Sequence, residues 1–109
     1  MVIESEAGPR EGIHVIRLRG PLTLSTLFDF QDVARRETSP VLIVDVSETP
    51  YMDSAGLGSL LGIFASCQKT GRKFGLAGVS PRIHTLLEVT HVDKILPAFA
   101  TVTDAVNGL

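Results

Sequence analysis

The sequence predicts an α/β domain with a mixed β-sheet and helices packed mainly on one side of it. Two strand patterns joined by a short turn open the chain, which is typical of an antiparallel hairpin. Beyond them, stretches with helical and with strand periodicity alternate, as they do in parallel α/β units. The chain has 109 residues, of which 44% are hydrophobic and 20% charged, so we expect one domain, residues 1–109, with a single core.

The start of the chain predicts the hairpin. Residues 1–7 and 13–20 read as strands, and the turn between them, residues 8–12, contains glycine and proline, which interrupt regular structure. Apolar and polar side chains alternate in the second strand, which indicates that one of its faces is half exposed.

A helix and a central strand follow. Residues 23–37 carry apolar side chains near helical spacing, and we expect Thr23 or Ser25 to cap the first turn and residues 38–40 to end the helix. The segment VLIVDV, residues 41–46, starts with consecutive apolar side chains that would face both sides of a sheet. This pattern indicates a strand covered by helices on at least one side.

The next part of the chain predicts a second helix and another strand. Residues 57–68 show one apolar stripe with a polar end, and Lys69 and Gly71 are typical of a helix end. Residues 74–79 read as a strand. The expected stripe of the helix consists of Leu57, Leu60, Leu61, Phe64, Ala65 and Gln68.

The remaining residues predict a third helix, a short strand and a closing helix. Ser80 and Pro81 are the residue types that cap and open a helix. Residues 94–99 suggest a short last strand. Thr101 and Asp104 have the Thr-x-x-Asp spacing of a helix start.

Charge and hydropathy limit the classes of partner. The formal net charge is −2 and the isoelectric point is about 5.8, so we expect no nucleic-acid partner. The apolar runs are too short to span a bilayer, and the first residues lack the features of a signal peptide, so we expect no membrane insertion and a cytoplasmic location. A single cysteine, Cys67, excludes an intramolecular disulfide, and its apolar surroundings indicate a buried or half-buried thiol.

The segment YMDSAGLGSLLG, residues 51–62, joins the central strand to the second helix. Asp53 and Ser54 lie just before the apolar stripe, near the expected carboxyl edge of the sheet, where functional groups gather in α/β proteins. Ser54 could cap the helix, act as a nucleophile or receive a modification. Each glycine in a helix costs up to about 1 kcal/mol of stability relative to alanine. Several glycines in one helix therefore suggest that the backbone of a partner or of a neighbouring loop comes close to the helix there. The helix contains Gly56, Gly58 and Gly62.

Residues 41–64 resemble the signature of the STAS domain, in particular that of bacterial anti-sigma factor antagonists. That signature combines Asp-x-Ser at the end of a buried strand with Asp-Ser-(Ser or Ala)-Gly-Leu-Gly at a helix start. Asp45 and Ser47 match its first part, and residues 53–58, DSAGLG, match its second part. The segments IRLRGPL and GLAGVSPRIHTLLEVTHVDKIL resemble other parts of the family, so the resemblance covers essentially the whole chain.

The resemblance implies a partner switch. The unmodified antagonist would bind an anti-sigma factor that is also a serine kinase with a GHKL-type ATP site, and a sigma factor would be released. The kinase would phosphorylate Ser54, and a PP2C-type phosphatase would restore the serine. The chain itself would be no enzyme and need no cofactor, and its oligomeric state stays open between a monomer and a weak dimer. The expected partner-binding residues are Thr23, Asp53, Ser54, Ala55, Gly56, Leu57 and Gly58.

Two positions depart from the family's pattern. Thr23 stands where many antagonists carry an aspartate, and His91 stands where the family often has glycine. The change at Thr23 is compatible with an alternative function. Other STAS modules serve as scaffolds of stress-signalling assemblies or as regulatory subunits of transport systems, without this phosphorylation cycle.

Catalysis by Ser54 is a weaker hypothesis. The sequence MDSAG lacks the glycine two residues before the serine that a nucleophile elbow uses. The possible bases are His14, His84 and His91, and no two of them have the spacing of metal ligands on one face.

Overall fold

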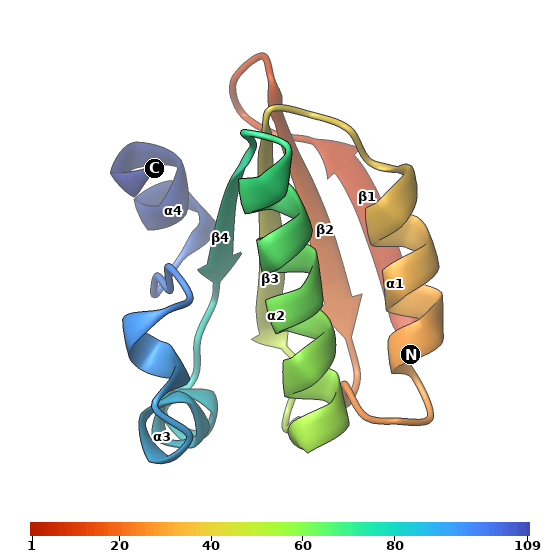
Figure 1. Ribbon diagram of the computed structural model, residues 1–109, viewed down its shortest axis with the longest axis vertical. Helices are drawn as coiled ribbons and strands as arrows, with labels where there is room; N and C mark the ends of the chain where they lie inside the picture. Colours follow the sequence, from red (N-terminus) through yellow and green to blue (C-terminus); the bar gives the residue numbers. More distant parts are fainter.

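The computed structural model describes all of residues 1–109 and contains one four-stranded sheet in the order β1–β2–β3–β4 (Figure 1). β1 (Val2–Ala7) pairs antiparallel with β2 (Ile13–Arg19), which confirms the hairpin. β2, β3 (Val41–Glu48) and β4 (Lys73–Ala77) are parallel neighbours. The sheet is therefore mixed, as predicted.

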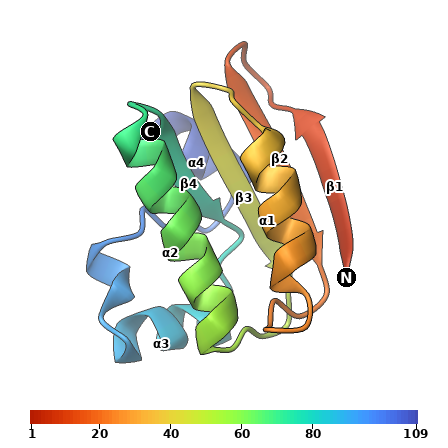
Figure 2. The same cartoon turned by 45° about the vertical axis from the view of Figure 1, so that its right-hand side comes forward.

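The helices cover the two faces of the sheet unequally. α1 (Leu27–Arg36), α2 (Ser54–Lys69) and α3 (Pro81–Val89) contribute to the main core on one face. α4 (Val102–Gly108) packs on the opposite face (Figure 2). A short 3-10 helix, Val92–Lys94, follows α3. The prediction that helices lie mainly on one side is confirmed.

Alternation along the strands creates two hydrophobic clusters. Ile16 and Leu18 of β2 are fully buried in the main core, whereas Val15 points to the other face and joins the small cluster under α4. Successive side chains of a strand face opposite sides of a sheet, so both faces of β2 and β3 need cover. This requirement explains the apolar run at the start of β3.

The predicted helix caps of the second half are confirmed. Ser80 accepts a hydrogen bond from the N–H of Ile83 at 3.3 Å, and Thr101 accepts one from the N–H of Asp104 at 3.0 Å. Gly71, just beyond α2, has a φ of +73°, a conformation that glycine adopts at little cost.

The start of α1 differs from the prediction, because neither Thr23 nor Ser25 caps it. The helix begins at Leu27, after Thr26. The Thr26 hydroxyl accepts a hydrogen bond from the N–H of Thr23 at 2.9 Å and donates one to the carbonyl oxygen of Pro21 at 2.8 Å. The residues that were expected to form the first turn are instead an ordered loop stabilised by this hydroxyl.

The predicted strand at residues 94–99 does not form. Only one β-bridge, between Leu76 and Ala98, links this segment to β4. The N–H of Leu76 donates to the carbonyl of Pro97 and the N–H of Phe99 donates to the carbonyl of Leu76, each at 2.8 Å. Because Pro97 has no N–H to donate, the ladder cannot extend from this bridge toward residues 94–96.

The buried face of α2 also differs from the predicted stripe. Ala65 and Gln68 are exposed, whereas Ile63 and Cys67 are buried. α2 carries apolar residues around most of its circumference, so periodicity alone does not select the face that packs on the sheet. The buried Cys67 thiol matches its prediction, and burial raises its pKa.

Candidate functional site

The loop between β3 and α2 ends in an aspartate that caps the helix. Oδ1 of Asp53 accepts a hydrogen bond from the N–H of Gly56 at 2.7 Å, and Oδ2 accepts one from the N–H of Leu24 at 3.1 Å. These bonds, that of Gly56 first, hold the pKa of the Asp53 carboxyl below its usual range. One carboxylate therefore stabilises the start of α2 and joins it to the loop before α1.

The loop before α1, residues 21–26, lies against residues 51–53. Leu22 and Met52 form a parallel β-bridge. The N–H of Leu22 donates to the carbonyl of Tyr51, and the N–H of Asp53 donates to the carbonyl of Leu22, both at 3.2 Å. The connections that follow β2 and β3 thus meet at one edge of the sheet and bring the half-buried Thr23 close to the start of α2.

Ser54 is the first residue of α2, and its side chain is exposed. The role of helix cap, one of three roles open to Ser54 from the sequence, belongs to Asp53. The Ser54 hydroxyl forms no hydrogen bond within the chain, and Ala55 beside it is half-buried. The first turn of a helix favours negative charge, so the helix itself tolerates an anion attached at this position.

The glycines of α2 have two different explanations. A methyl group on Gly56 would lie on the carbonyl oxygen of Leu22 and 2.7 Å from its carbonyl carbon, so the neighbouring loop requires glycine there. Gly58 and Gly62 have open space around them. At these two positions no side chain covers the α2 backbone, and Gly58 lies one helical turn after Ser54.

The predicted partner-binding residues of this segment differ in their exposure. Asp53, Ser54 and Gly58 are exposed. Gly56 and Leu57 are buried, and Leu57 is part of the main core. The exposed residues are accessible to a partner, while the buried residues hold the first turns of α2 against the rest of the fold.

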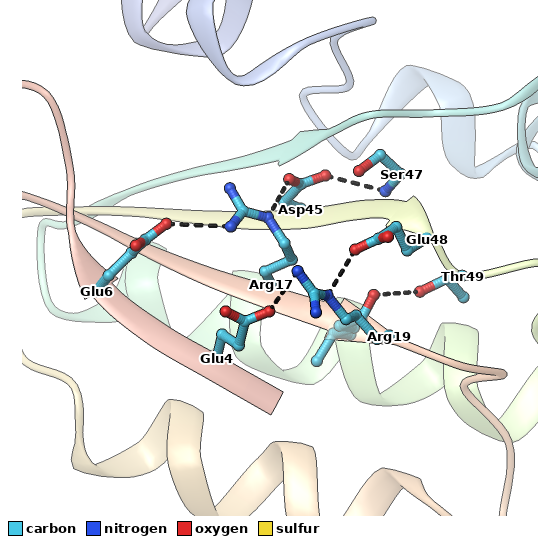
Figure 3. Close-up of polar contacts among 9 residues, drawn as sticks. Glu4, Glu6, Arg17, Arg19, Asp45, Ser47, Glu48 and Thr49 are labelled. Carbon is cyan, nitrogen blue, oxygen red and sulfur yellow. Dashed lines mark hydrogen bonds and ion pairs between the residues drawn. The ribbon is translucent and has the colours of Figure 1, made fainter. Parts of the chain in front are cut away.

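Asp45, the first residue of the Asp-x-Ser pair, is buried on the face of the sheet opposite α1 and α2. Its Oδ2 accepts a hydrogen bond from Nε of Arg17 at 3.0 Å, and its Oδ1 accepts one from the N–H of Ser47 at 2.9 Å (Figure 3). Gly78, at a φ of +71°, packs so closely that a Cβ there would lie 2.6 Å from Oδ1. Asp45 therefore links β2 to the end of β3 and packs against the backbone that follows β4.

The arginines on this face are neutralised by neighbouring carboxylates. Arg17 also lies 3.2 Å from Glu6, and Arg19 lies 2.8 Å from Glu4 and 2.7 Å from Glu48 (Figure 3). Exposed pairs of this kind contribute about 0–1 kcal/mol each. The face has no free cation among these residues.

Two of the three histidines pair with carboxylates. His14 lies 3.2 Å from Glu37, and His84 lies 3.2 Å from Glu88. None of the histidines forms a hydrogen bond with Ser54. No three His, Cys, Asp or Glu side chains come together as metal ligands. None of the helices has the length and apolar character that crossing a membrane requires.

His91 has a φ of +60° in the turn after α3. This left-handed conformation is the one that glycine adopts most readily, which gives a physical reason for the glycine often found there in the resembling family. Histidine is among the residue types that adopt it more often than most.

Residues 5–105 match the family of the STAS domain. The chain belongs to the STAS domain family. Among curated relatives of this STAS domain, the anti-sigma F factor antagonist of Paenibacillus polymyxa is 25% identical over 113 residues, which cover 100% of this chain and 97% of the relative. The anti-sigma-B factor antagonist of Listeria monocytogenes is 39% identical over 56 residues, which cover 51% of this chain and 49% of that protein.

Solved structures share the fold of this STAS domain. A putative anti-sigma factor antagonist from Thermotoga maritima has a TM-score of 0.89 at 17% identity, covering 97% of this chain and 92% of that one. SpoIIAA has TM-scores of 0.75 unphosphorylated and 0.72 phosphorylated, at 22% and 19% identity; the matches cover 99% and 97% of this chain and 98% and 97% of SpoIIAA. A sulfate transporter family protein from Wolinella succinogenes has a TM-score of 0.79 at 25% identity, covering 88% of this chain and 83% of that one.

Proposed function

We propose that this STAS domain is a cytoplasmic anti-sigma factor antagonist whose binding to an anti-sigma factor is controlled by phosphorylation of Ser54. The relative from Paenibacillus polymyxa, which matches along the whole chain and is named an anti-sigma F factor antagonist, supports the class of partner. The observation that carries the proposal is the position of Ser54. It is exposed, it starts α2, and its hydroxyl is free because Asp53 supplies the cap.

The anti-sigma factor is also proposed to be the kinase, with a GHKL-type ATP site. Oγ of Ser54 attacks the γ-phosphorus of ATP, the new O–P bond forms as the bond to the ADP oxygen breaks, and the hydroxyl proton leaves to a base of the kinase or to water. A PP2C-type phosphatase reverses the modification by hydrolysis and releases inorganic phosphate. The STAS domain provides the substrate hydroxyl and no catalytic group.

The surroundings of Ser54 explain why a phosphate would release the partner. A phosphoserine carries about −1.5 to −2 charges at neutral pH. The Gly56 N–H, a natural donor to such an anion, already donates to Asp53. The Asp53 carboxylate also repels the negatively charged phosphate. The phosphate therefore remains a surface charge. Burying it in an interface that offers no cation or hydrogen-bond donor to it costs several kcal/mol. A cost of about 3 kcal/mol raises Kd about a hundredfold.

Phosphopeptide mapping and partner binding test the proposal. In native cells, we expect phosphate on Ser54 with an occupancy that differs between growth and stress. In a pull-down, the Ser54→Ala chain should keep the anti-sigma factor in the presence of ATP, and Ser54→Asp should bind it more weakly in calorimetry. Ser66→Ala, an exposed serine of the same helix, is the matched control and should behave like wild type. Release of the Ser54→Ala chain by ATP as readily as wild type would refute the proposal.

A regulatory role in a transport system is the second candidate. The likeness to a sulfate transporter family protein, at 25% identity, favours it, and Thr23 is compatible with it. An unmodified Ser54 under every growth condition, together with equal binding by wild type and Ser54→Asp, would support this alternative.

A further inference from the structure

A groove runs beside the start of α2, between residues 51–52 and α3. Figures 1 and 2 both place α3 next to the N-terminal end of α2. The groove has a volume of about 330 Å³, and five of its seven lining residues are hydrophobic. The lining residues are Tyr51, Met52, Arg82, Ile83, Thr85, Leu86 and Val89.

The rim of the groove exposes apolar side chains that the fold does not use. Val89 is 71% exposed and Tyr51 is 43% exposed. α3 already fills the core with Ile83 and Leu87, which are both 1% exposed. Exposed apolar surface that adjoins a hollow is typical of a protein interaction site.

Arg82 sets the charge of this groove. Its guanidinium carbon lies 5.5 Å from the centre of the Tyr51 ring, and Arg82 is the only charged residue of the lining. It takes part in none of the ion pairs of the chain. The other two residues of α3 with ionisable side chains, His84 and Glu88, lie 3.2 Å from each other and do not line the groove. The exposed planar group over the Tyr51 ring therefore has free donors, and a guanidinium can bind a carboxylate through two of them.

We propose that this groove docks an acidic segment of the anti-sigma factor, with an apolar side chain seated between Tyr51 and Val89 and a carboxylate bound to Arg82. This inference rests on the proposed function, because it assigns the groove to the same partner as Ser54.

The position of the groove couples it to the phosphorylation site. Ser54 follows Tyr51 by three residues, so their Cα atoms lie within about 11 Å. Exposed charges farther apart than the Debye length, about 8 Å at physiological salt, are largely screened. Phosphate on Ser54 would therefore repel acidic side chains that the segment places at the Tyr51 end of the groove, in addition to the cost of burying the phosphate itself.

Calorimetry with four charge variants tests the groove. The probe is the purified anti-sigma factor of the protein's own organism, the one that the Ser54→Ala chain retains in the pull-down. We expect Arg82→Glu and Val89→Asp to raise its Kd at least tenfold, and the effect of Arg82→Glu to shrink at high salt. Lys69→Glu and Ile95→Asp change exposed residues outside the groove and should stay within twofold of wild type. Circular dichroism checks that each variant is folded, and Arg82→Ala and Val89→Ala replace any that is not.

The outcomes separate this inference from the proposed function. If both groove variants bind within twofold of wild type while Ser54→Asp binds more weakly, the groove proposal is overturned and the proposed function stands. If the groove variants lose affinity but Ser54→Asp does not, the docking site stands and the control by phosphorylation fails. A dimer in sedimentation that Val89→Asp dissolves, with the affinity for the anti-sigma factor unchanged, would assign the groove to a second copy and overturn the proposal.

Discussion

Replacing Gly56 with alanine puts a methyl group where the fold has no room for one. The methyl would overlap the carbonyl oxygen of Leu22 and lie 2.7 Å from its carbonyl carbon, whereas ordinary contact begins at 3.4 Å, so the Leu22 backbone has to withdraw by more than about 0.7 Å. This shift strains the 3.2 Å hydrogen bond from the N–H of Asp53 to the Leu22 carbonyl. Overpacking costs about 1–3 kcal/mol and a lost hydrogen bond about 1 kcal/mol, while alanine returns up to about 1 kcal/mol of helix preference. We expect the free energy of unfolding to fall by about 1–3 kcal/mol.

Gly58→Ala is the matched control for this change. Gly58 lies in the same helix with nothing within 4 Å of the added methyl group, so alanine should stabilise the chain by about 0.5–1 kcal/mol. Urea unfolding followed by circular dichroism measures both variants, and their midpoints should move in opposite directions. A Gly56→Ala chain as stable as wild type, or a Gly58→Ala chain destabilised to the same extent, would contradict the close approach of Leu22.

Two further changes test the charges inside the fold. Asp45→Asn removes the buried negative charge that faces the half-buried Arg17 and should cost about 1–3 kcal/mol, whereas Glu48→Gln, in an exposed pair, should cost less than about 1 kcal/mol. Equal losses in urea titrations would argue against a structural role for Asp45. Burial raises the pKa of Glu37, but the hydrogen bonds from Ser39, the nearby His14 and the hydrogen bond from the N–H of Thr38 together outweigh it and leave the pKa below its ordinary value of 4.5. The ionised Glu37 therefore stabilises the fold at pH values above its ordinary pKa. This contribution is lost as the pH falls through the lowered pKa of Glu37 in the folded chain. Between about pH 6 and about pH 3, the stability of Glu37→Gln should fall less steeply than that of wild type, and identical slopes would contradict this assignment.

The elements that local chemistry specifies were predicted correctly from the sequence. The hairpin, the apolar strand at 41–46 and the caps at Ser80 and Thr101 all agree with the structure. Each of these depends on residues that are close together in the chain. A capping hydroxyl binds an amide three residues away, and an alternating strand shows its two faces in its own sequence.

The errors fall where distant contacts compete with local patterns. Residues 23–26 have a helical pattern, yet they form a loop because the preceding Leu22 pairs with Met52. Residues 94–99 resemble a strand, yet they reach β4 through a single bridge at Ala98. The periodicity of a segment contains no information about which backbone will lie beside it.

The candidate site shows the same division. The motif placed Asp53 and Ser54 at the start of a helix, and the structure has α2 beginning at Ser54 behind the Asp53 cap. The bond from the Leu24 N–H to Asp53 was not predictable, because it joins two loops that are distant in sequence. The groove at Arg82 was missed for the same reason, since its walls come from separate elements.

By itself, the sequence determined the kind of elements, their order along the chain and the family, because these follow from residue types at fixed local spacing. Only the tertiary structure decided which glycine of α2 is required by the fold and which are left free for a partner. The parallel pairing of β2 and β3 brings their following loops to the same edge, so the Leu22 carbonyl meets α2 at Gly56 and leaves Gly58 and Gly62 open. That contact depends on the register between β2 and β3 and on the paths of the connections that follow these two strands. No single segment of the chain specifies this register or these paths.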